Sequence, residues 1–194
     1  ARERRREYAM DIRVDTSNIE IKTDRLILRA FRESDLGDFF EYASVPGVGE
    51  MAGWPHHESI EASKQILRTF IEENEVFAIY HKEEGKVIGS LGLHKSWAND
   101  DETYGHLKVK EIGYVLSKSF WGLGLMPEAV GAVIGYGFTE LGLDAFTCGH
   151  FAENSQSRRV IEKCGFGFVK ASEFYSSQLQ HSFEDRKYIL IRNF

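Results

Sequence analysis

The hydrophobic and polar positions of this chain change period from one segment to the next. Alternating or short apolar runs predict strands at 25–31, 75–81, 86–94, 111–116, from 145, at 167–175 and at 183–191. Apolar residues at helical spacing predict helices from Ser34, over 59–73, from Pro127 and from Asn154. Hairpins come early and strand–helix–strand units come late. The pattern therefore predicts an α/β chain with a mixed sheet of about seven strands and four helices.

One segment combines three of these elements. From Glu111 to Ala129 the chain reads E-I-G-Y-V-L-S-K-S-F-W-G-L-G-L-M-P-E-A, so an apolar strand leads through a glycine loop into a helix. Glycines allow tight backbone turns, and the first N–H groups of a helix have no partner within the helix. Pro127 falls just inside the helix start, where its missing N–H costs nothing. This arrangement is typical of a phosphate or pyrophosphate site.

Two other kinds of phosphate site that use glycine loops require residues at positions where this chain lacks them. A dinucleotide site needs a third glycine where Pro127 stands and a strand directly before the loop, whereas five residues separate Leu116 from Gly122 here. A P-loop is excluded because no Gly-Lys-Ser/Thr follows. A tight turn without a ligand stays open.

A second segment follows another predicted strand and reads N-S-Q-S-R-R-V-I-E-K-C-G-F from Asn154 to Phe166. Asn154 is placed to cap a helix, and Gly165 is placed to end it. Together with T-D-R-L-I-L-R from Thr23 to Arg29, the two segments resemble the GNAT superfamily of N-acetyltransferases. They resemble most its branch of ribosomal-protein N-terminal acetyltransferase-like enzymes. The resemblance covers roughly residues 21–193 and keeps the family's order of motifs.

The resemblance implies a sheet that splays between its fourth and fifth strands, with acetyl-CoA in the opening. The fourth strand would bind the pantetheine arm through its backbone, and the loop N–H groups would bind the pyrophosphate, except at Pro127. Asn154 would hold the pantetheine amides, although it also fits a helix cap alone. The implied cofactor residues are Tyr114, Val115, Leu116, Trp121, Gly122, Leu123, Gly124, Leu125, Met126, Asn154 and Ser157.

Two residues are candidates for catalysis. Glu111 is the candidate base that would take the amine proton, directly or through a water. The same residue could instead face solvent or attract the ammonium group of the acceptor. In many family members a tyrosine stands where this chain has Ile161, so that general acid is missing. Ser157 is the remaining hydroxyl, as an acid, a CoA contact or an ordinary first-turn helix residue.

The acceptor side is less well defined by the sequence. Trp54 and His94, together with Trp97, lie on segments that border the acceptor cleft in the resembling fold. His56 and His57 have no cysteine or carboxylate at ligand spacing, so we expect no metal site. The acceptor amine could be a protein N-terminus or a small molecule.

Length and charge are consistent with this picture. The chain has 194 residues, of which 42% are hydrophobic, enough for one domain, expected at 19–194. A charged extension is expected at 1–18. The formal charge of −6 argues against nucleic-acid binding and favours a cationic acceptor. Two cysteines in apolar patterns fit a reducing cytoplasm, and no membrane segment is expected. A homodimer is one option.

The sequence therefore predicts an acetyl-CoA-dependent N-acetyltransferase that transfers acetyl directly in a ternary complex. Two other classes stay open. One is a non-catalytic acyl-CoA-binding module, which would keep the loop and Asn154 but turn over no amine. The other is a dinucleotide-dependent oxidoreductase, which Pro127 disfavours.

Overall fold

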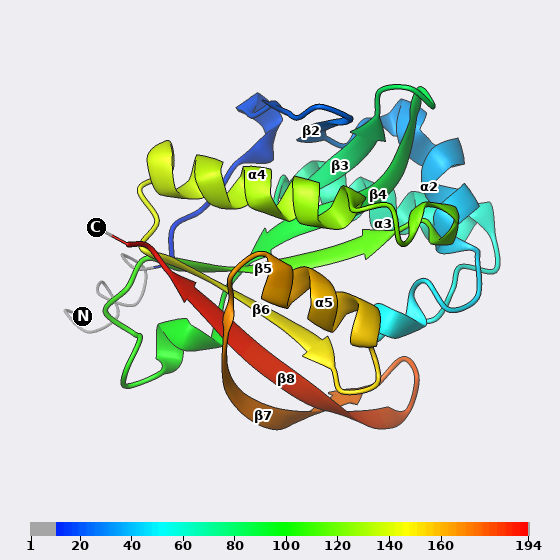
Figure 1. Cartoon of the computed structure of the whole chain (residues 1–194). Coiled ribbons are helices and arrows are strands. Elements are labelled where there is room, and N and C mark those ends of the chain that lie inside the picture. Colours follow the sequence, from blue (N-terminus) through cyan, green and yellow to red (C-terminus); the bar gives the residue numbers. More distant parts are fainter. Residues whose placement is uncertain (1–10, 194) are drawn as a thin grey trace.

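The structure is a computed structural model that describes residues 11–193. Its centre is an eight-stranded sheet in the order β1-β2-β3-β4-β5-β6-β8-β7 (Figure 1). The strands are β1 (Ile21–Lys22), β2 (Leu26–Ala30), β3 (Val76–His81), β4 (Lys86–His94), β5 (Val109–Leu116), β6 (Ala145–Phe151), β7 (Gly167–Ser176) and β8 (His181–Ile191). The α-helices within the described residues are α2 (Leu36–Ala43), α3 (Ile60–Glu73), α4 (Leu125–Thr139) and α5 (Ser155–Lys163). The mixed sheet with four helices is confirmed, and the two-residue β1 adds an eighth strand.

The sheet opens between β5 and β6, which are the fourth and fifth of the predicted strands. These two strands pair in parallel, and their pairing spans only Val109–Ile112 opposite Ala145–Cys148. Both strands continue beyond that point, and Figure 1 shows them diverging. Backbone groups of β5 after Ile112 therefore have no β6 partner on that side and remain available to a ligand.

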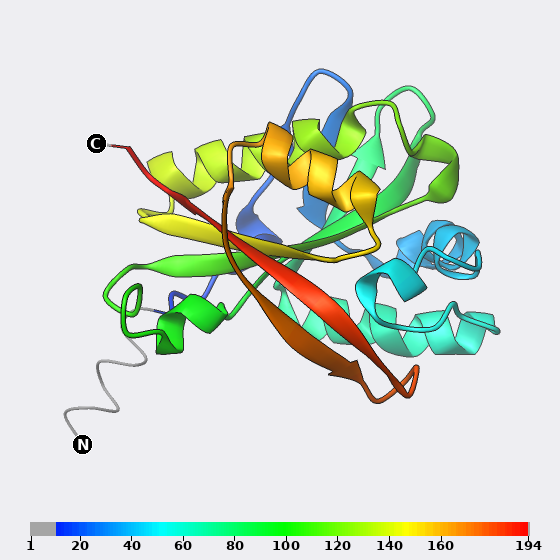
Figure 2. The same ribbon diagram turned by 60° about the horizontal axis from the view of Figure 1, so that its bottom comes forward.

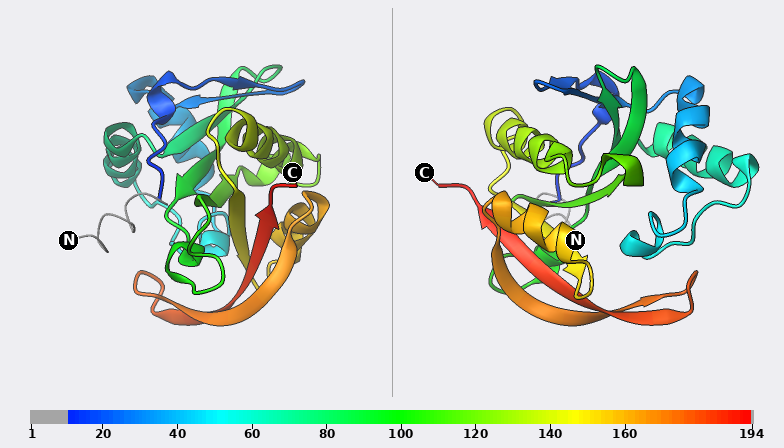
Figure 3. Two further views of the ribbon diagram at one scale, coloured as in Figure 1. Left: turned by 90° about the vertical axis from the view of Figure 1, so that its left-hand side faces the viewer. Right: turned by 45° about the vertical axis from the view of Figure 1, so that its right-hand side comes forward.

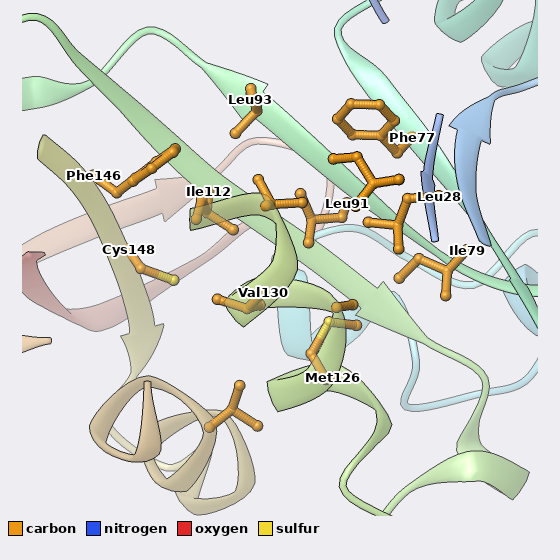
Figure 4. Close-up of a cluster of buried hydrophobic side chains, with 14 of the residues drawn as sticks. Leu28, Phe77, Ile79, Leu91, Leu93, Ile112, Met126, Val130, Phe146 and Cys148 are labelled. Carbon is orange, nitrogen blue, oxygen red and sulfur yellow. The ribbon is translucent and has the colours of Figure 1, made fainter. Parts of the chain in front are cut away.

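Helices cover both faces of the sheet. Helices α4 and α5 lie over one face and α2 and α3 over the other (Figure 3). The larger core lies under α4, where side chains of α4 pack on the central strands (Figure 4). Because side chains alternate along a strand, Leu91 and Leu93 of β4 point into this core, whereas Gly92 and His94 face α3. Both faces of β4 and β5 can therefore contribute to a site, one together with the loop before α4 and the other together with α3.

The first described residues pack on this domain. Val14 is buried in the larger core, and Lys110 Nζ on β5 pairs with Asp11 Oδ1 at 2.8 Å. Residues 11–18, which we expected to lie in the charged extension, are thus held against the sheet, while residues 1–10 lie outside the described residues. No helix within 11–193 has the length and apolarity needed to cross a bilayer.

The helix starts differ in how well the sequence predicted them. Asn154 is an N-cap, as predicted, and its Oδ1 accepts from Ser157 N at 3.0 Å. Ser59, where the predicted 59–73 helix begins, is also an N-cap: its Oγ accepts from Ala62 N at 3.2 Å. Ser34 is not a cap, because it lies within a short 3-10 turn before α2. The adjacent Asp35 accepts from Arg32 N at 2.8 Å and pairs with both terminal nitrogens of Arg29. The Asp35 carboxylate thus holds the turn before α2 against Arg29 of β2, and no side chain caps α2 itself.

Candidate active site

The loop before α4 has the geometry of an anion cradle. Gly122 and Gly124 both have positive φ angles, of 78° and 75°, which glycine adopts without steric cost. A Cβ on Gly122 would meet no atom within 4 Å, and one on Gly124 would meet only the Arg25 guanidinium, at 3.6 Å. The first N–H groups of α4 follow directly and lack acceptors within the helix. Loop and helix start therefore present donors to open space.

Arg25 connects this loop to the edge of the sheet, a role that the sequence analysis missed. Its Nε lies 2.9 Å from Glu128 Oε1 in the first turn of α4, and its Nη1 donates to Leu123 O at 2.9 Å. Thr23 Oγ1 donates to Glu128 Oε2 at 2.6 Å. Burial alone would raise the pKa of Glu128, but these hydrogen bonds from Thr23 and Arg25 outweigh it and lower that pKa. The T-D-R segment thus fixes the loop, and the Arg25–Glu128 ion pair lies beside it.

A cavity of about 350 Å³ occupies the opening between β5 and β6; we call it the splay cavity. It brings together most of the predicted cofactor and catalytic residues, namely Glu111, Tyr114, Val115, Leu116, Trp121, Met126, Asn154 and Ser157. His94, which was predicted for the acceptor side, also lines it. The predicted loop residues 122–125 do not line it. Leu123 is exposed and the side chain of Leu125 is buried in the core, so any ligand contact of Leu125 would use its backbone. Trp121 Nε1 donates to Leu116 O at 2.8 Å and so fixes the loop on the end of β5.

Tyr114 and Ser157 meet across the splay cavity. The two hydroxyl oxygens lie 2.6 Å apart, although the residues come from β5 and α5. Ser157 N also donates to Asn154 Oδ1 at 3.0 Å. This helix cap uses only the amide oxygen of Asn154, so the cap does not occupy its amide nitrogen. Burial raises the pKa of Tyr114 well above its ordinary value, and the hydrogen bond to Ser157 opposes that shift only in part. The sequence motifs assign only the backbone of Tyr114 to the cofactor, so they do not predict the contact of its side chain with Ser157. Ile161, at the position where many family members have a tyrosine, is fully buried in the core.

Glu111 stands at the edge of the splay cavity on the same face as Gly113 and Val115, as strand alternation predicts. Burial raises the pKa of Glu111; nearby Lys187 lowers it, Asp185 raises it and a hydrogen bond with Thr147 lowers it, with a net upward shift. A carboxyl group whose pKa is displaced toward neutrality is better suited to accept a proton. The environment is therefore compatible with the predicted base.

A second cavity, of about 560 Å³, lies between α3 and the other face of β4 and β5; we call it the aromatic cavity. It is lined by Trp54 and His94, which the sequence predicted for the acceptor side. Trp97 lines neither cavity: its ring packs on Tyr104 and beneath Lys170. The two cavities share Ala52, His94, Gly113, Tyr114 and Val115. Two separate approaches thus meet at the backbone of β5.

The loop between α2 and α3 closes this part of the molecule. Figure 2 shows the loop beside the end of the β7–β8 hairpin, where Ser176 Oγ donates to Gly53 O at 2.7 Å. Within residues 11–193, no group of three or more His, Cys, Asp or Glu side chains is placed to hold a metal ion.

Comparison with known proteins gives a consistent family. Residues 25–167 match the model of the acetyltransferase (GNAT) domain. The chain is 30% identical over 151 residues to the uncharacterized N-acetyltransferase YoaA of Bacillus subtilis, covering 75% of this chain and 81% of YoaA.

Solved structures show the same fold. A GNAT-family acetyltransferase from Bacillus anthracis superposes with a TM-score of 0.75 at 23% identity, over 89% of this chain and 98% of that one. RimL, a ribosomal L7/L12 alpha-N-protein acetyltransferase solved with coenzyme A, gives a TM-score of 0.71 at 18% identity, over 89% and 98% of the two chains.

Proposed function

Because this chain belongs to the GNAT family of acetyltransferases, we propose that it transfers an acetyl group from acetyl-CoA to a primary amine in a ternary complex. One observation carries the proposal: the splay cavity and the aromatic cavity approach β5 from different sides and share Gly113, Tyr114 and Val115. Two substrates can therefore be bound together, one in each cavity. Their reacting groups would meet at β5, whose backbone has no β6 partner after Ile112.

The residues present fit acetyl-CoA. The diphosphate would lie on the loop that contains Gly122 and Gly124, where no side chain fills the space above the backbone. The Arg25 guanidinium, which is paired with Glu128, lies at the edge of this loop and is a further hydrogen-bond donor there. Asn154 has an amide nitrogen that can reach into the splay cavity. When bound there, acetyl-CoA supplies an activated thioester, whose C–S bond breaks as the amine nitrogen bonds to the carbonyl carbon.

The chain's own residues would manage the charge and the protons. A free N–H of β5 beside Val115 would donate to the thioester oxygen, an interaction often worth about 3 kcal/mol in such reactions. Glu111 would remove a proton from the amine, directly or through a water. Ser157 would donate a hydrogen bond to the departing sulfur, with the Tyr114 hydroxyl behind it.

The raised pKa of Tyr114 limits its role. A thiol has an ordinary pKa of roughly 8.5, so full proton transfer from a buried tyrosine to a thiolate is uphill. The hydroxyl pair is therefore proposed to stabilise the thiolate by hydrogen bonding, with solvent supplying the proton. The acceptor class includes protein N-termini, which the resemblance to the ribosomal-protein branch supports, and small-molecule amines.

The test is ligand-dependent stability followed by turnover. Acetyl-CoA at about 100 times its Kd should stabilise the fold by roughly 2.7 kcal/mol, and NAD at the same concentration should not. A panel of amines and N-terminal peptides should then release free thiol from acetyl-CoA. Stabilisation by NAD alone would overturn the assignment. Acetyl-CoA binding without turnover of any amine would instead support the non-catalytic module.

A further inference from the structure

The aromatic cavity contains none of the charged side chains that would bind a second ionic group of an acceptor. Within the described residues that line it there is no Lys, Arg, Asp or Glu. Phe39 and Phe70 form its deep wall, Trp54 and Pro55 lie on the loop side, and Ile66 closes it from α3. Its volume of about 560 Å³ is in the usual range for a small-molecule site. Such a lining favours an uncharged apolar group.

The histidines of this cavity do not change that character. His57 Nδ1 lies 2.7 Å from Ser63 Oγ, and burial, helped by the neighbouring His56, lowers the pKa of His57. His56 Nδ1 lies 2.7 Å from Glu50 Oε1. Glu50 also accepts from the backbone N–H groups of Gly47 and His56. These contacts fix the loop around Trp54 in place, so the cavity wall is largely preformed.

The end of the cavity nearest the sheet is formed by two glycines and the His94 ring that lies over them. Gly92 of β4 and Gly113 of β5 stand directly opposite each other. A Cβ on Gly92 would collide with the His94 ring, whereas one on Gly113 would only touch it, at 3.6 Å. The two glycines let the imidazole lie over the sheet and leave room above it for a flat or extended group. A group in that space would touch the strands beside the shared residues.

Two carboxylates lie near this end of the cavity. Glu111 stands opposite His94 in the strand register, and His94 Nδ1 lies 3.5 Å from Glu75 Oε2. An acceptor is thus offered carboxylates beside the reacting position, and elsewhere a lining that is mainly aromatic and aliphatic, with uncharged polar groups from Gln65, Ser90 and Gln178. A polyamine, which carries further cations along its chain, would place them against that lining at a large desolvation cost.

We propose that the aromatic cavity binds the apolar body of the acceptor, so that the substrate is a primary amine bearing a bulky aromatic or branched aliphatic group a few bonds from its nitrogen. This inference rests on the proposed function, since it names the substrate class of that same site. The same chemistry occurs in small aromatic amines and in polypeptides whose first residue has a large apolar side chain. Both place a cation beside Glu111 and hydrocarbon against Phe39 and Phe70.

The first experiment compares matched acceptors by free-thiol release from acetyl-CoA. Full burial of a phenylalanine-sized side chain is worth about 1.5–3 kcal/mol, or roughly 10- to 150-fold in affinity, so kcat/KM for 2-phenylethylamine should exceed that for propylamine by up to about 100-fold. Spermidine should be poorer than 2-phenylethylamine. The peptides Phe-Ala-Ala and Ser-Ala-Ala form the second arm. A strong preference for Phe-Ala-Ala over both Ser-Ala-Ala and 2-phenylethylamine would assign the cavity to protein N-termini.

The second experiment fills the cavity. Ala62 lines it from α3, whereas Lys64 on the same helix is exposed and does not. Ala62→Phe should lower the ratio of kcat/KM between 2-phenylethylamine and propylamine at least tenfold. Lys64→Phe, which adds the same side chain outside the cavity, should leave this ratio unchanged. Equal rates for the two amines, a preference for spermidine, or equal effects of both variants would overturn the inference.

Calorimetry separates this inference from the proposed function. Acetyl-CoA binding with turnover of amines, but without preference for apolar ones, would overturn the inference and leave acetyl transfer intact. If acetyl-CoA did not bind, the proposed function would fail; direct binding of 2-phenylethylamine that is weakened by Ala62→Phe and not by Lys64→Phe would still support the cavity assignment. If 2-phenylethylamine bound neither in the presence nor in the absence of acetyl-CoA, the inference would be overturned.

Discussion

The two sides of β5 are built in different ways. The side that faces α4 and α5 presents backbone N–H groups from the glycine loop, the start of α4 and the unpaired end of β5. The side that faces α3 presents side chains from α2, the following loop, α3 and β4. Backbone donors suit a constant group such as a diphosphate, because their geometry hardly depends on neighbouring side chains. Side chains set size and polarity, so they suit the variable substrate.

Glu111 lies where the two sides meet, and its replacement should have the largest effect. Glu111→Gln keeps the shape and removes the base, so kcat should fall by about 10²- to 10⁴-fold. Acetyl-CoA affinity should stay nearly the same, because the cofactor side does not depend on this carboxylate. The limb of the pH–rate profile that reports the base should flatten. A raised KM for the amine with normal kcat would mean that Glu111 only attracts the acceptor's ammonium group.

The cofactor side can be broken at Gly124. Gly124→Val should block backbone approach and cost charge-assisted hydrogen bonds of about 1.5–3 kcal/mol each, which corresponds to roughly a 10- to 100-fold rise in KM for acetyl-CoA. Because φ is 75° at Gly124, valine also strains the fold there. Gly142→Val is the matched control, since Gly142 has φ 65° and open space around it but follows the C-terminal end of α4, whereas the proposed phosphate loop precedes its N-terminal end. It should lose similar stability and keep its KM. Similar acetyl-CoA affinity in both variants, measured by calorimetry, would show that the phosphate site lies elsewhere.

The hydroxyl pair should matter less than Glu111. Ser157→Ala and Tyr114→Phe each remove one partner of the hydrogen bond across the splay cavity. Neutral hydrogen bonds contribute about 0.5–1.5 kcal/mol, so kcat should fall roughly 2- to 10-fold in each. The double variant should lose little more than either single variant, because the two hydroxyls act as one unit. A loss of 100-fold or more in Ser157→Ala alone would instead identify Ser157 as an obligatory acid.

The smallest effect should be on stability and should depend on pH. Burial raises the pKa of Glu111 above its ordinary value of 4.5, so the folded state disfavours the charged carboxylate. Stability is then lost as the pH rises above about 4.5 and through the folded-state pKa. Glu111→Gln should therefore have a slightly higher Tm than the parent chain at pH 7, and this gain should vanish in acid.

Glu73→Gln, at the exposed end of α3, is the control for this measurement and should show no such pH-dependent gain. A lower Tm for Glu111→Gln at pH 7 would contradict the prediction. It would mean that Lys187 and Thr147, which favour the charged form, stabilise Glu111 more than its burial destabilises it.

The sequence by itself determined the elements and the cofactor motif. Alternation and helical spacing depend on neighbouring residues, and so do the caps at Ser59 and Asn154 and the glycine turn before α4. Such local features form wherever the same short segment occurs. The position of Glu111 on the face of Gly113 and Val115 followed from alternation alone.

Only the tertiary structure decided which distant side chains meet. Tyr114 and Ser157 are 43 positions apart, and Arg25 and Glu128 are 103 apart, so no periodicity connects them. The role of Asp35 in the turn before α2 also depended on its contact with Arg29 from β2, which the helical spacing does not show. The aromatic cavity likewise exists only because α2, α3 and a loop pack over two opposed glycines. A cavity is space left between packed elements, and its shape depends on all of them at once.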